Sequence, residues 1–216
     1  MLTATLGKPG APLSILCLGA HCDDIEIGCG GTIFRLLSER PGSSVHWVVF
    51  ASDPKREAEA RASAAAMLAG AGKSVVEVHR FRESFFPYVG DSIKDEFEKL
   101  KRAVAPELVL THRTTDAHQD HRTIAELTWN TFRDHLIAEY EIPKYEGDLG
   151  HPNVFVPLNE AGAKRKIDHV VRFFPSQAER RWFRPETFEA LLRLRGMECA
   201  APDGLAEAFH IRKLTL

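Results

Sequence analysis

The stretch that decides the fold is residues 14–37, which read SILCLGAHCDDIEIGCGGTIFRLL. Its first part, residues 14–20, is mostly apolar and ends in Gly-Ala, which is typical of a buried parallel strand. Residues 28–39 begin with glycines and continue with apolar residues at helical spacing, so they predict a helix. Between the two elements lie a histidine, two adjacent aspartates and a glutamate. The stretch therefore predicts a strand, a turn and a helix, with ionisable groups where the strand ends.

The same alternation of strand and helix continues along the chain. We expect strands at 43–52, 73–81 and 106–112, and helices at 55–69, at 91–105 with Asp91 as N-cap, and at 121–135. Further on, 136–142 indicates a strand, 143–158 a loop, 161–174 and 185–195 helices, and 207–216 a closing edge strand. This order implies a mostly parallel sheet covered by helices on both faces, a Rossmann-like three-layer α/β sandwich. No break in composition marks a linker, so we expect one domain over 1–216.

Composition limits the class of protein. Of the 216 residues, 44% are hydrophobic and 27% are charged, and the net charge is −2, as in ordinary globular proteins. This charge balance gives no basic field for a nucleic acid partner. No apolar run approaches the about 18 residues that span a bilayer, and the N-terminus lacks the pattern of a secretion signal. Cys17 and Cys199 read as small buried hydrophobes. We therefore expect a cytoplasmic protein without an integral membrane segment.

Two segments place titratable groups at strand ends, where open α/β sheets have their binding crevice. AHCDDIEIGCGGT (20–32) follows the first strand and THRTTDAHQDHRT (111–123) follows the fourth. Together they supply His21, Asp23, Asp24, His112, Asp116, His118, Asp120 and His121. A catalytic zinc ion takes three nitrogen or oxygen ligands and leaves a position for water. His21 and Asp24 can reach one point from a tight turn, and His121 can add the third ligand from the neighbouring loop.

Each of these signals also has a simpler interpretation. Adjacent aspartates at a strand end often form a turn or a helix cap. A G-x-G-G-T segment that opens a helix resembles a phosphate-binding turn. These interpretations keep open a Rossmann-type nucleotide-binding protein in which GCGGT binds phosphate and the histidines are incidental. A non-catalytic carbohydrate-binding relative would instead predict a degraded set of ligands. The presence of both segments at separate strand ends favours a metal site.

AHCDDIEIGCGGT resembles the A-H-P-D-D-x-x-x-G-x-G-G-T signature of the LmbE-like or PIG-L family of zinc-dependent N-deacetylases. DAHQDHRT resembles the second signature of that family, H-x-D-H, and LAEAFHIRK is similar to its usual Y-A-E-A-F near the C-terminus. The resemblance includes both motifs, their order and their separation. It implies an LmbE-like deacetylase fold and a hydrolase that removes the acetyl group from an N-acetylated amino sugar.

The resemblance also implies roles for individual residues. It implies that His21, Asp24 and His121 ligate zinc, that Asp23 is the general base, and that His118 stabilises the oxyanion with Asp120 as its orienting partner. A carboxylate that accepts a hydrogen bond from His118 would raise the pKa of that imidazole and keep it protonated. Arg56 and Glu83 stand where relatives contact the sugar, so the resemblance implies that they contact the substrate.

The expected cofactor is Zn²⁺, with iron(II) as an alternative because one aspartate and two histidines do not distinguish these metals. The expected partner is a small molecule or glycoconjugate that carries an N-acetyl group, such as a GlcNAc-type unit of a glycoconjugate, a polysaccharide or a natural-product precursor. The resemblance also implies a homo-oligomer. It does not identify the acetylated substrate or its pathway.

The chain departs from the family pattern at three positions. Cys22 replaces the usual proline and places a thiol beside the predicted metal, although its neighbours occupy the ligand positions. Asp116 stands where mycothiol-pathway relatives carry a catalytic tyrosine, which argues against the inositol-glycoside substrate of that branch. Leu205 stands where the C-terminal motif usually has tyrosine. The 143–158 segment is expected to be a lid, and His112 is expected either to support the ligands or to pack in the core.

Overall fold

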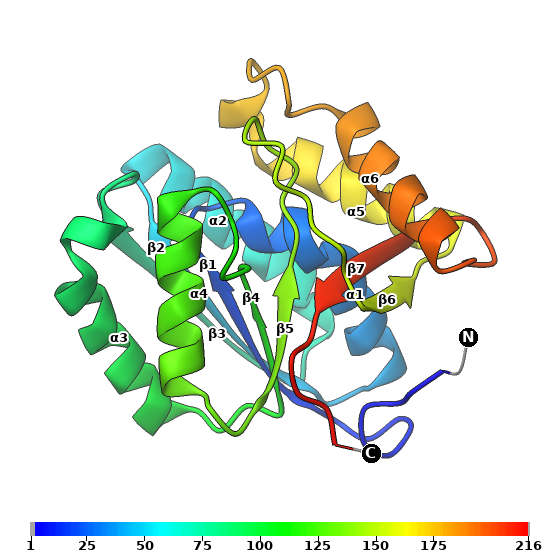
Figure 1. Cartoon of the computed structure of the whole chain (residues 1–216), viewed down its shortest axis with the longest axis horizontal. Coiled ribbons are helices and arrows are strands. Elements are labelled where there is room, and N and C mark those ends of the chain that lie inside the picture. Colours follow the sequence, from blue (N-terminus) through cyan, green and yellow to red (C-terminus); the bar gives the residue numbers. More distant parts are fainter. Residues whose placement is uncertain (1–2, 216) are drawn as a thin grey trace.

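Seven strands form one sheet in the order β3-β2-β1-β4-β5-β7-β6 in the computed structural model, which describes residues 3–215 (Figure 1). The strands are β1 (Ser14–Gly19), β2 (Ser44–Ala51), β3 (Lys73–Phe81), β4 (Leu108–Thr111), β5 (Leu136–Tyr140), β6 (Val154–Pro157) and β7 (Ala206–His210). The first five strands pair in parallel, and β7 runs antiparallel to both β5 and β6. The prediction of a mostly parallel sheet is confirmed.

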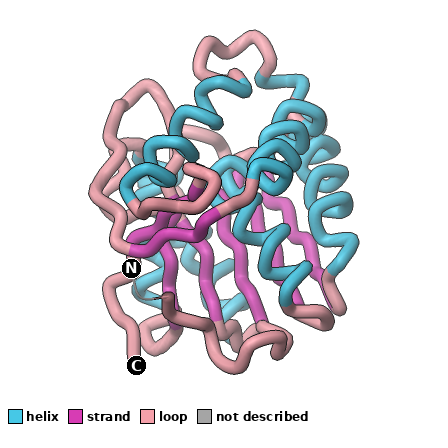
Figure 2. The backbone as a smooth tube through the Cα atoms, turned by 90° about the vertical axis from the view of Figure 1, so that its right-hand side faces the viewer, coloured by secondary structure: helices cyan, strands magenta, loops and turns pink. Residues whose placement is uncertain are grey.

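Helices cover both faces of this sheet (Figure 2). They are α1 (Asp24–Glu39), α2 (Pro54–Met67), α3 (Gly90–Ala103), α4 (Gln119–Thr131), α5 (Glu160–Phe173) and α6 (Pro185–Glu198), with short 3₁₀ turns η1 (Leu68–Gly70), η2 (Phe86–Tyr88) and η3 (Pro175–Gln177). The core on one face includes side chains of α1, α2, α5 and α6, and the core on the other face includes side chains of α3 and α4. The predicted three-layer sandwich is therefore confirmed.

The central strand explains where the site lies. In β1, Ile15 and Cys17 enter the core on one face, whereas Leu16 and Leu18 enter the core on the other. A strand that is buried on both faces must be apolar throughout, as this one is. β1 lies between β2 and β4, so the chain order of the strands reverses beside it. Such a reversal leaves a crevice at the carboxyl ends of the strands.

The helix after β1 differs from the prediction. It begins at Asp24, not at residue 28, and it is kinked at Cys29, whose φ of −146° is not helical. After the kink, the buried N–H groups of Gly31 and Thr32 donate to the Glu207 carboxylate at 2.8 and 2.6 Å. The glycine-rich turn therefore lies inside a kinked helix. A side chain at Gly28 would clash with the ring of Tyr140, so close packing accounts for that glycine.

Three other predictions of secondary structure also differ from the structure. Helix α3 has Val89 at its N-cap, and Asp91 lies within the first turn, so the predicted cap at Asp91 is wrong. The 143–158 segment contains β6 and is not a loop throughout. The predicted edge strand is β7, which pairs on both sides and is therefore internal; Leu216, part of that prediction, lies outside the described residues. Alternation of apolar and polar residues predicts a strand but does not show how many neighbours it has.

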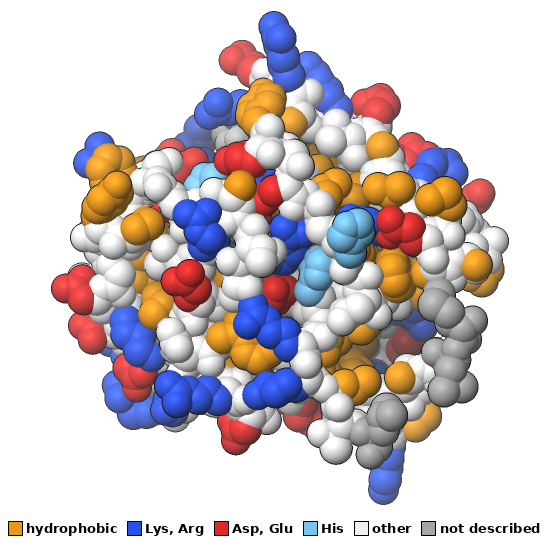
Figure 3. Space-filling model, in the orientation of Figure 1, with side chains coloured by type: hydrophobic (Ala, Val, Ile, Leu, Met, Phe, Trp, Pro, Cys, Tyr) orange, Lys and Arg blue, Asp and Glu red, His pale blue; other side chains and the backbone are white. Residues whose placement is uncertain are grey.

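Within residues 3–215, no helix combines the length and the apolar character needed to cross a bilayer. On the face shown in Figure 3, basic and acidic side chains are interspersed. The expectation of one domain over 1–216 stays a prediction, since residues 1, 2 and 216 are not described.

Candidate metal centre

The three predicted ligands converge on one point. His21 Nδ1 lies 3.1 Å from His121 Nε2 and 3.3 Å from Asp24 Oδ2, and His121 Nε2 lies 3.6 Å from Asp24 Oδ1. Ligand atoms around a tetrahedral zinc ion are about 3.3 Å apart. All three side chains are buried. The donors therefore have the spacing of one face of a zinc coordination sphere, although their role as ligands stays a prediction.

Local structure explains this convergence. The backbone N–H of His21 donates to Asp24 Oδ2 at 2.6 Å, which holds the turn at the end of β1 closed. His121 lies in the first turn of α4, directly after the loop that follows β4. Because β1 and β4 are paired neighbours, their carboxyl ends place the two turns side by side. Two groups are compact enough to hold a metal ion: His21, His118 and His121, and Asp24, His112 and His121. Each contains two of the three predicted ligands, and neither is the full predicted set.

Each predicted histidine ligand has a carboxylate behind it. His121 Nδ1 lies 3.1 Å from Asp116 Oδ2, and His21 Nε2 lies 3.1 Å from Asp120 Oδ2. Metal-binding histidines usually have such a partner, because it fixes the orientation and the tautomer of the ring. This arrangement is a second reason why the donor set fits a metal ion.

Asp120 was predicted to orient His118, but its carboxylate contacts a different histidine. Its carboxylate accepts the backbone N–H groups of Ser84 at 2.6 Å and Phe86 at 3.2 Å and faces His21, not the ring of His118. Only the backbone N–H of Asp120 reaches His118, donating to Nδ1 at 3.2 Å. The first turn of α4 directs this side chain toward the β3–α3 connection, where backbone donors surround it. Asp120 therefore orients His21.

The two predicted histidine ligands differ in their electrostatic surroundings. Burial alone would lower the pKa of His21, but Asp24 and Asp120 raise it to about 10. Burial, together with the neighbouring charge of His112, lowers the pKa of His121 to about 3, so His121 is neutral, the form that can ligate a metal. Burial would raise the pKa of Asp24, but His121, His112 and His21 hold it well below its usual value. The carboxylates thus stabilise positive charge on His21, whereas the surroundings of His121 oppose positive charge on that ring.

Asp23 is buried beside these groups and contacts Arg56 from the next helix. Its Oδ1 accepts a hydrogen bond from Arg56 Nη2 at 2.9 Å, and its Oδ2 has no hydrogen-bond partner among the described residues 3–215. Burial raises the pKa of Asp23, and Arg56 opposes this shift. Arg56 also contacts Glu83 Oε2 at 3.2 Å, and the Glu83 side chain is 56% exposed. The structure therefore places Arg56 on Asp23; contacts of Arg56 and Glu83 with a substrate stay predictions.

His118 is half-buried and lies against both histidine ligands. Its ring centroid lies 4.9 Å from that of His21 and 4.6 Å from that of His121. Burial, followed by the positive charge of His21, lowers its pKa, and the opposing effect of Asp120 is too small to reverse this shift. The expectation that Asp120 keeps His118 protonated is therefore wrong. The neutral ring instead accepts a hydrogen bond at Nδ1, which places its own proton on Nε2.

The two open questions about His112 and Cys22 have structural answers. His112 Nε2 accepts the Ala20 N–H at 2.9 Å and lies 3.1 Å from Asp24 Oδ2, and its ring stacks on His121. His112 thus supports the predicted ligands. The Cys22 thiol donates to the Ala51 carbonyl at 3.3 Å, and burial raises its pKa, so it stays protonated and faces away from ligation.

The glycine-rich turn has no free donors for phosphate at Gly31 and Thr32. Glu207 occupies the N–H groups of both residues, and it is itself paired with Lys166 Nζ at 2.6 Å. The whole GCGGT segment is buried. A phosphate would have to displace a buried carboxylate, so the predicted nucleotide-binding alternative fails on the structure. Leu205, close to Glu207 in sequence, is buried in a small apolar cluster.

Sequence reasoning missed the functions of three residues. Lys144 was expected only as part of the lid, yet its Nζ lies 3.0 Å from Asp116 Oδ2. The Tyr140 hydroxyl lies 3.3 Å from His112 Nε2 and donates to the Leu18 carbonyl at 2.7 Å. Glu207 caps the kinked part of α1. The motif E-A-F near the C-terminus was the only signal for any of these contacts.

The fold and the donor set define an α/β protein with a candidate divalent-metal centre beside its central strand. Within this class the chain belongs to the PIG-L family, described as GlcNAc-PI de-N-acetylase, whose model matches residues 16–132. That range contains all the residues predicted as ligands and both signature motifs. No curated protein matches the chain significantly.

Solved structures share the fold at low sequence identity. N,N′-diacetylchitobiose deacetylase from Pyrococcus horikoshii is 19% identical, with a TM-score of 0.68 over 95% of this chain and 84% of that one. The conserved protein TT1542 from Thermus thermophilus is 20% identical, with a TM-score of 0.72 over 94% and 96%. GalB, the 4-carboxy-2-hydroxymuconate hydratase from Pseudomonas putida, is 18% identical, with a TM-score of 0.72 over 94% and 98%. The fold alone therefore does not select one reaction.

Proposed function

We propose that this protein is a zinc-dependent N-deacetylase that hydrolyses the acetamide group of an N-acetylated amino sugar. Membership of the de-N-acetylase family supports amide hydrolysis, and the shared fold of the chitobiose deacetylase is consistent with it. The observation that carries the proposal is the relation of Asp23 to the donor triangle. Asp23 is buried, directly precedes Asp24 and lies two residues from His21, and one of its oxygens has no partner within residues 3–215. The three donors beside it have the spacing of metal ligands.

The residues that would hold the ion are His21, Asp24 and His121. When bound, zinc supplies Lewis acidity, which polarises an amide carbonyl and makes water a better nucleophile at neutral pH. Asp23 is then the base. Arg56 occupies Oδ1, so Oδ2 is the oxygen that takes the proton from water and later delivers it to the departing amine.

His118 is placed to stabilise the negative oxygen that develops during amide hydrolysis. Because Nδ1 accepts the Asp120 N–H, the neutral ring carries its proton on Nε2 and can donate from there. A fixed donor aimed at developing charge lowers the barrier without the ring being protonated. The expected role of His118 thus stands as a proposal, with neutral imidazole as the donor.

Some expectations stay predictions. Iron(II) remains the alternative metal, since aspartate and histidine ligands accept both ions. A cytoplasmic location, a homo-oligomeric assembly and a GlcNAc-type substrate are not tested by the site geometry.

Metal analysis and acetate release test the proposed function. The purified protein should contain stoichiometric zinc or iron, and incubation with a set of N-acetylated sugars should release acetate from at least one class. Asp23→Asn should retain the metal and lose activity by about a hundredfold or more. Asp91→Asn changes an exposed aspartate on α3 and is the matched control. A protein without metal, or an active Asp23→Asn variant, would overturn the proposal. Since the fold also occurs in a hydratase, acetate must be the measured product.

A further inference from the structure

Asp116 connects His121 to the loop that follows β5. Its Oδ2 lies 3.1 Å from His121 Nδ1 and 3.0 Å from Lys144 Nζ, and its Oδ1 accepts the backbone N–H of His118 at 2.8 Å. The Asp116 side chain is 3% exposed. One buried carboxylate therefore contacts a predicted metal ligand, the backbone of the predicted oxyanion donor and a lysine from a distant loop.

This arrangement determines the tautomer of His121. Both oxygens of Asp116 face groups that carry protons, so the proton of neutral His121 lies on Nδ1. The lone pair of His121 Nε2 is then directed toward His21 Nδ1 and Asp24. Only this tautomer can ligate a metal through Nε2.

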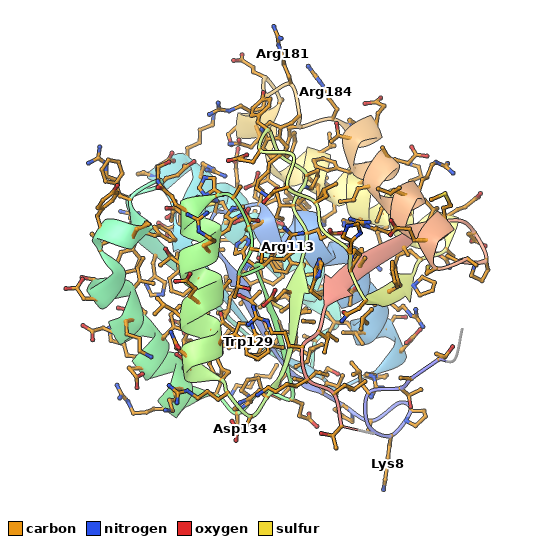
Figure 4. All side chains as sticks on the ribbon, in the orientation of Figure 1. Lys8, Arg113, Trp129, Asp134, Arg181 and Arg184 are labelled. Carbon is orange, nitrogen blue, oxygen red and sulfur yellow. The ribbon has the colours of Figure 1, made fainter. Side chains whose placement is uncertain are left out.

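Lys144 is also held by the loop itself. Its Nζ lies 2.5 Å from Asp148 Oδ1, and Asp148 Oδ2 accepts the Ala117 N–H at 2.6 Å. Arg113, labelled in Figure 4, donates to the Asp148 carbonyl at 2.5 Å. The Lys144 side chain is only 9% exposed, so two carboxylates must compensate for the cost of burying its charge. The loop is thus closed onto the turn that carries Asp116.

We propose that Asp116 and Lys144 are positioning residues for His121 and that closure of the loop at residues 143–150 is coupled to metal binding. The inference rests on the proposed metal centre and adds a role for the loop. Lys144 holds the Asp116 carboxylate against the His121 ring. Because coupling between two sites is reciprocal, the closed loop strengthens metal binding and bound metal stabilises the closed loop.

Zinc affinity, measured by competition with a chromophoric chelator on the full chain, tests the first half of the proposal. Asp116→Asn should weaken zinc binding about 10- to 100-fold. An asparagine amide must present its NH₂ group to a donor whichever way it turns, because both oxygens of Asp116 now face donors. Lys144→Met should weaken binding by about fivefold or more, and Lys144→Arg should restore most of it.

Lys164→Met is the matched control, since Lys164 is 75% exposed and pairs with Asp168 on the same helix. Its zinc affinity should equal that of the wild type. If Asp116→Asn fails to fold, the comparison of Lys144→Met with Lys144→Arg carries the test. Unchanged zinc affinity in a folded Lys144→Met variant would overturn the proposal.

Hydrogen exchange of the 143–150 loop tests the second half. Zinc should slow exchange in this loop in the wild type and in Lys164→Met, and should have much less effect in Lys144→Met. Equal protection in all three proteins would show that the loop is not coupled to the metal. This failure is distinguishable from failure of the proposed function, because the wild type would still bind zinc and release acetate.

Discussion

Arg56 binds Asp23 through one carboxylate oxygen, 2.9 Å away, and the other oxygen has no partner in the part of the chain that the structure describes. The arginine comes from the first turn of α2 and the aspartate from the turn after β1. A clamp of this kind fixes the orientation of the proposed base before a substrate arrives. It also opposes the rise in the pKa of Asp23 that burial causes.

Removing the clamp should reduce activity without removing the metal. In Arg56→Met, we expect kcat/KM to fall by about 10- to 100-fold, the effect of losing one hydrogen bond to a charged group. Zinc content should not change. Arg61→Met removes an exposed arginine from the same helix and should have nearly normal kinetics. If the two variants behave alike, Arg56 does not orient the base.

The same variant should change the pH dependence of the reaction. Arg56 lowers the pKa of Asp23 and burial raises it, so loss of the arginine leaves the effect of burial unopposed. The base must be ionised to act, and the acidic limb of the pH–rate profile should therefore move to higher pH in Arg56→Met. The profile of Arg61→Met is the reference. A shift to lower pH would contradict the assignment of this limb to Asp23.

Asp120 should matter for metal binding more than for His118. Asp120→Asn weakens the carboxylate contact to His21, so we expect zinc affinity to fall about 10- to 100-fold. Asp134→Asn changes a side chain that is 92% exposed and labelled at the lower edge of Figure 4, and it should leave zinc affinity unchanged. If Asp120→Asn bound zinc normally but lost activity, the result would support the role predicted from sequence, in which Asp120 orients His118.

The pairing of Glu207 with α1 should contribute strongly to stability. Glu207→Gln removes the buried charge that faces Lys166 and weakens the cap on Gly31 and Thr32. Breaking one side of a buried ion pair costs about 3–5 kcal/mol of unfolding free energy. Denaturant titration measures this loss, with Glu189→Gln in an exposed helical pair as the control. A loss of the same small size in both variants would contradict the capping role.

Glu26 should make folding stability depend on pH. Burial raises its pKa to about 8 in the folded protein, and Ser63 donates a hydrogen bond to it. Its stabilising effect is complete below the unfolded pKa of about 4.5 and is lost as pH rises toward about 8, with a slope of at most about 1.4 kcal/mol per pH unit. Glu26→Gln does not titrate, so its unfolding free energy should fall less over this range. Parallel pH curves would show that Glu26 is ionised in the folded state.

Local sequence patterns predicted the strands and helices of this fold well, because each pattern is contained within a few neighbouring residues. The apolar run of β1 and the helical spacing of α4 need no knowledge of distant segments. The turn between His21 and Asp24 is equally local. It was therefore possible to predict both the sheet and the residues that converge at its carboxyl edge.

Contacts between distant segments were not predictable from these patterns. Asp120 and His118 are near in sequence, which suggested a pair, but backbone donors at Ser84 and Phe86 turn the carboxylate toward His21. The N–H groups that follow the kink at Cys29 donate to Glu207, which arrives only with β7 near the end of the chain. Hydrophobic periodicity carries no information about such pairings.

The separation between His21 and His121 also has a consequence during synthesis. A ribosome-bound polypeptide that has exposed only β1 through α3 possesses two of the three donors, and the third emerges with α4. In the proposed metal centre, all three donors would meet only after β4 has docked beside β1. Metal uptake by this centre would therefore be a late event in biogenesis, and the chain would first be produced without the ion.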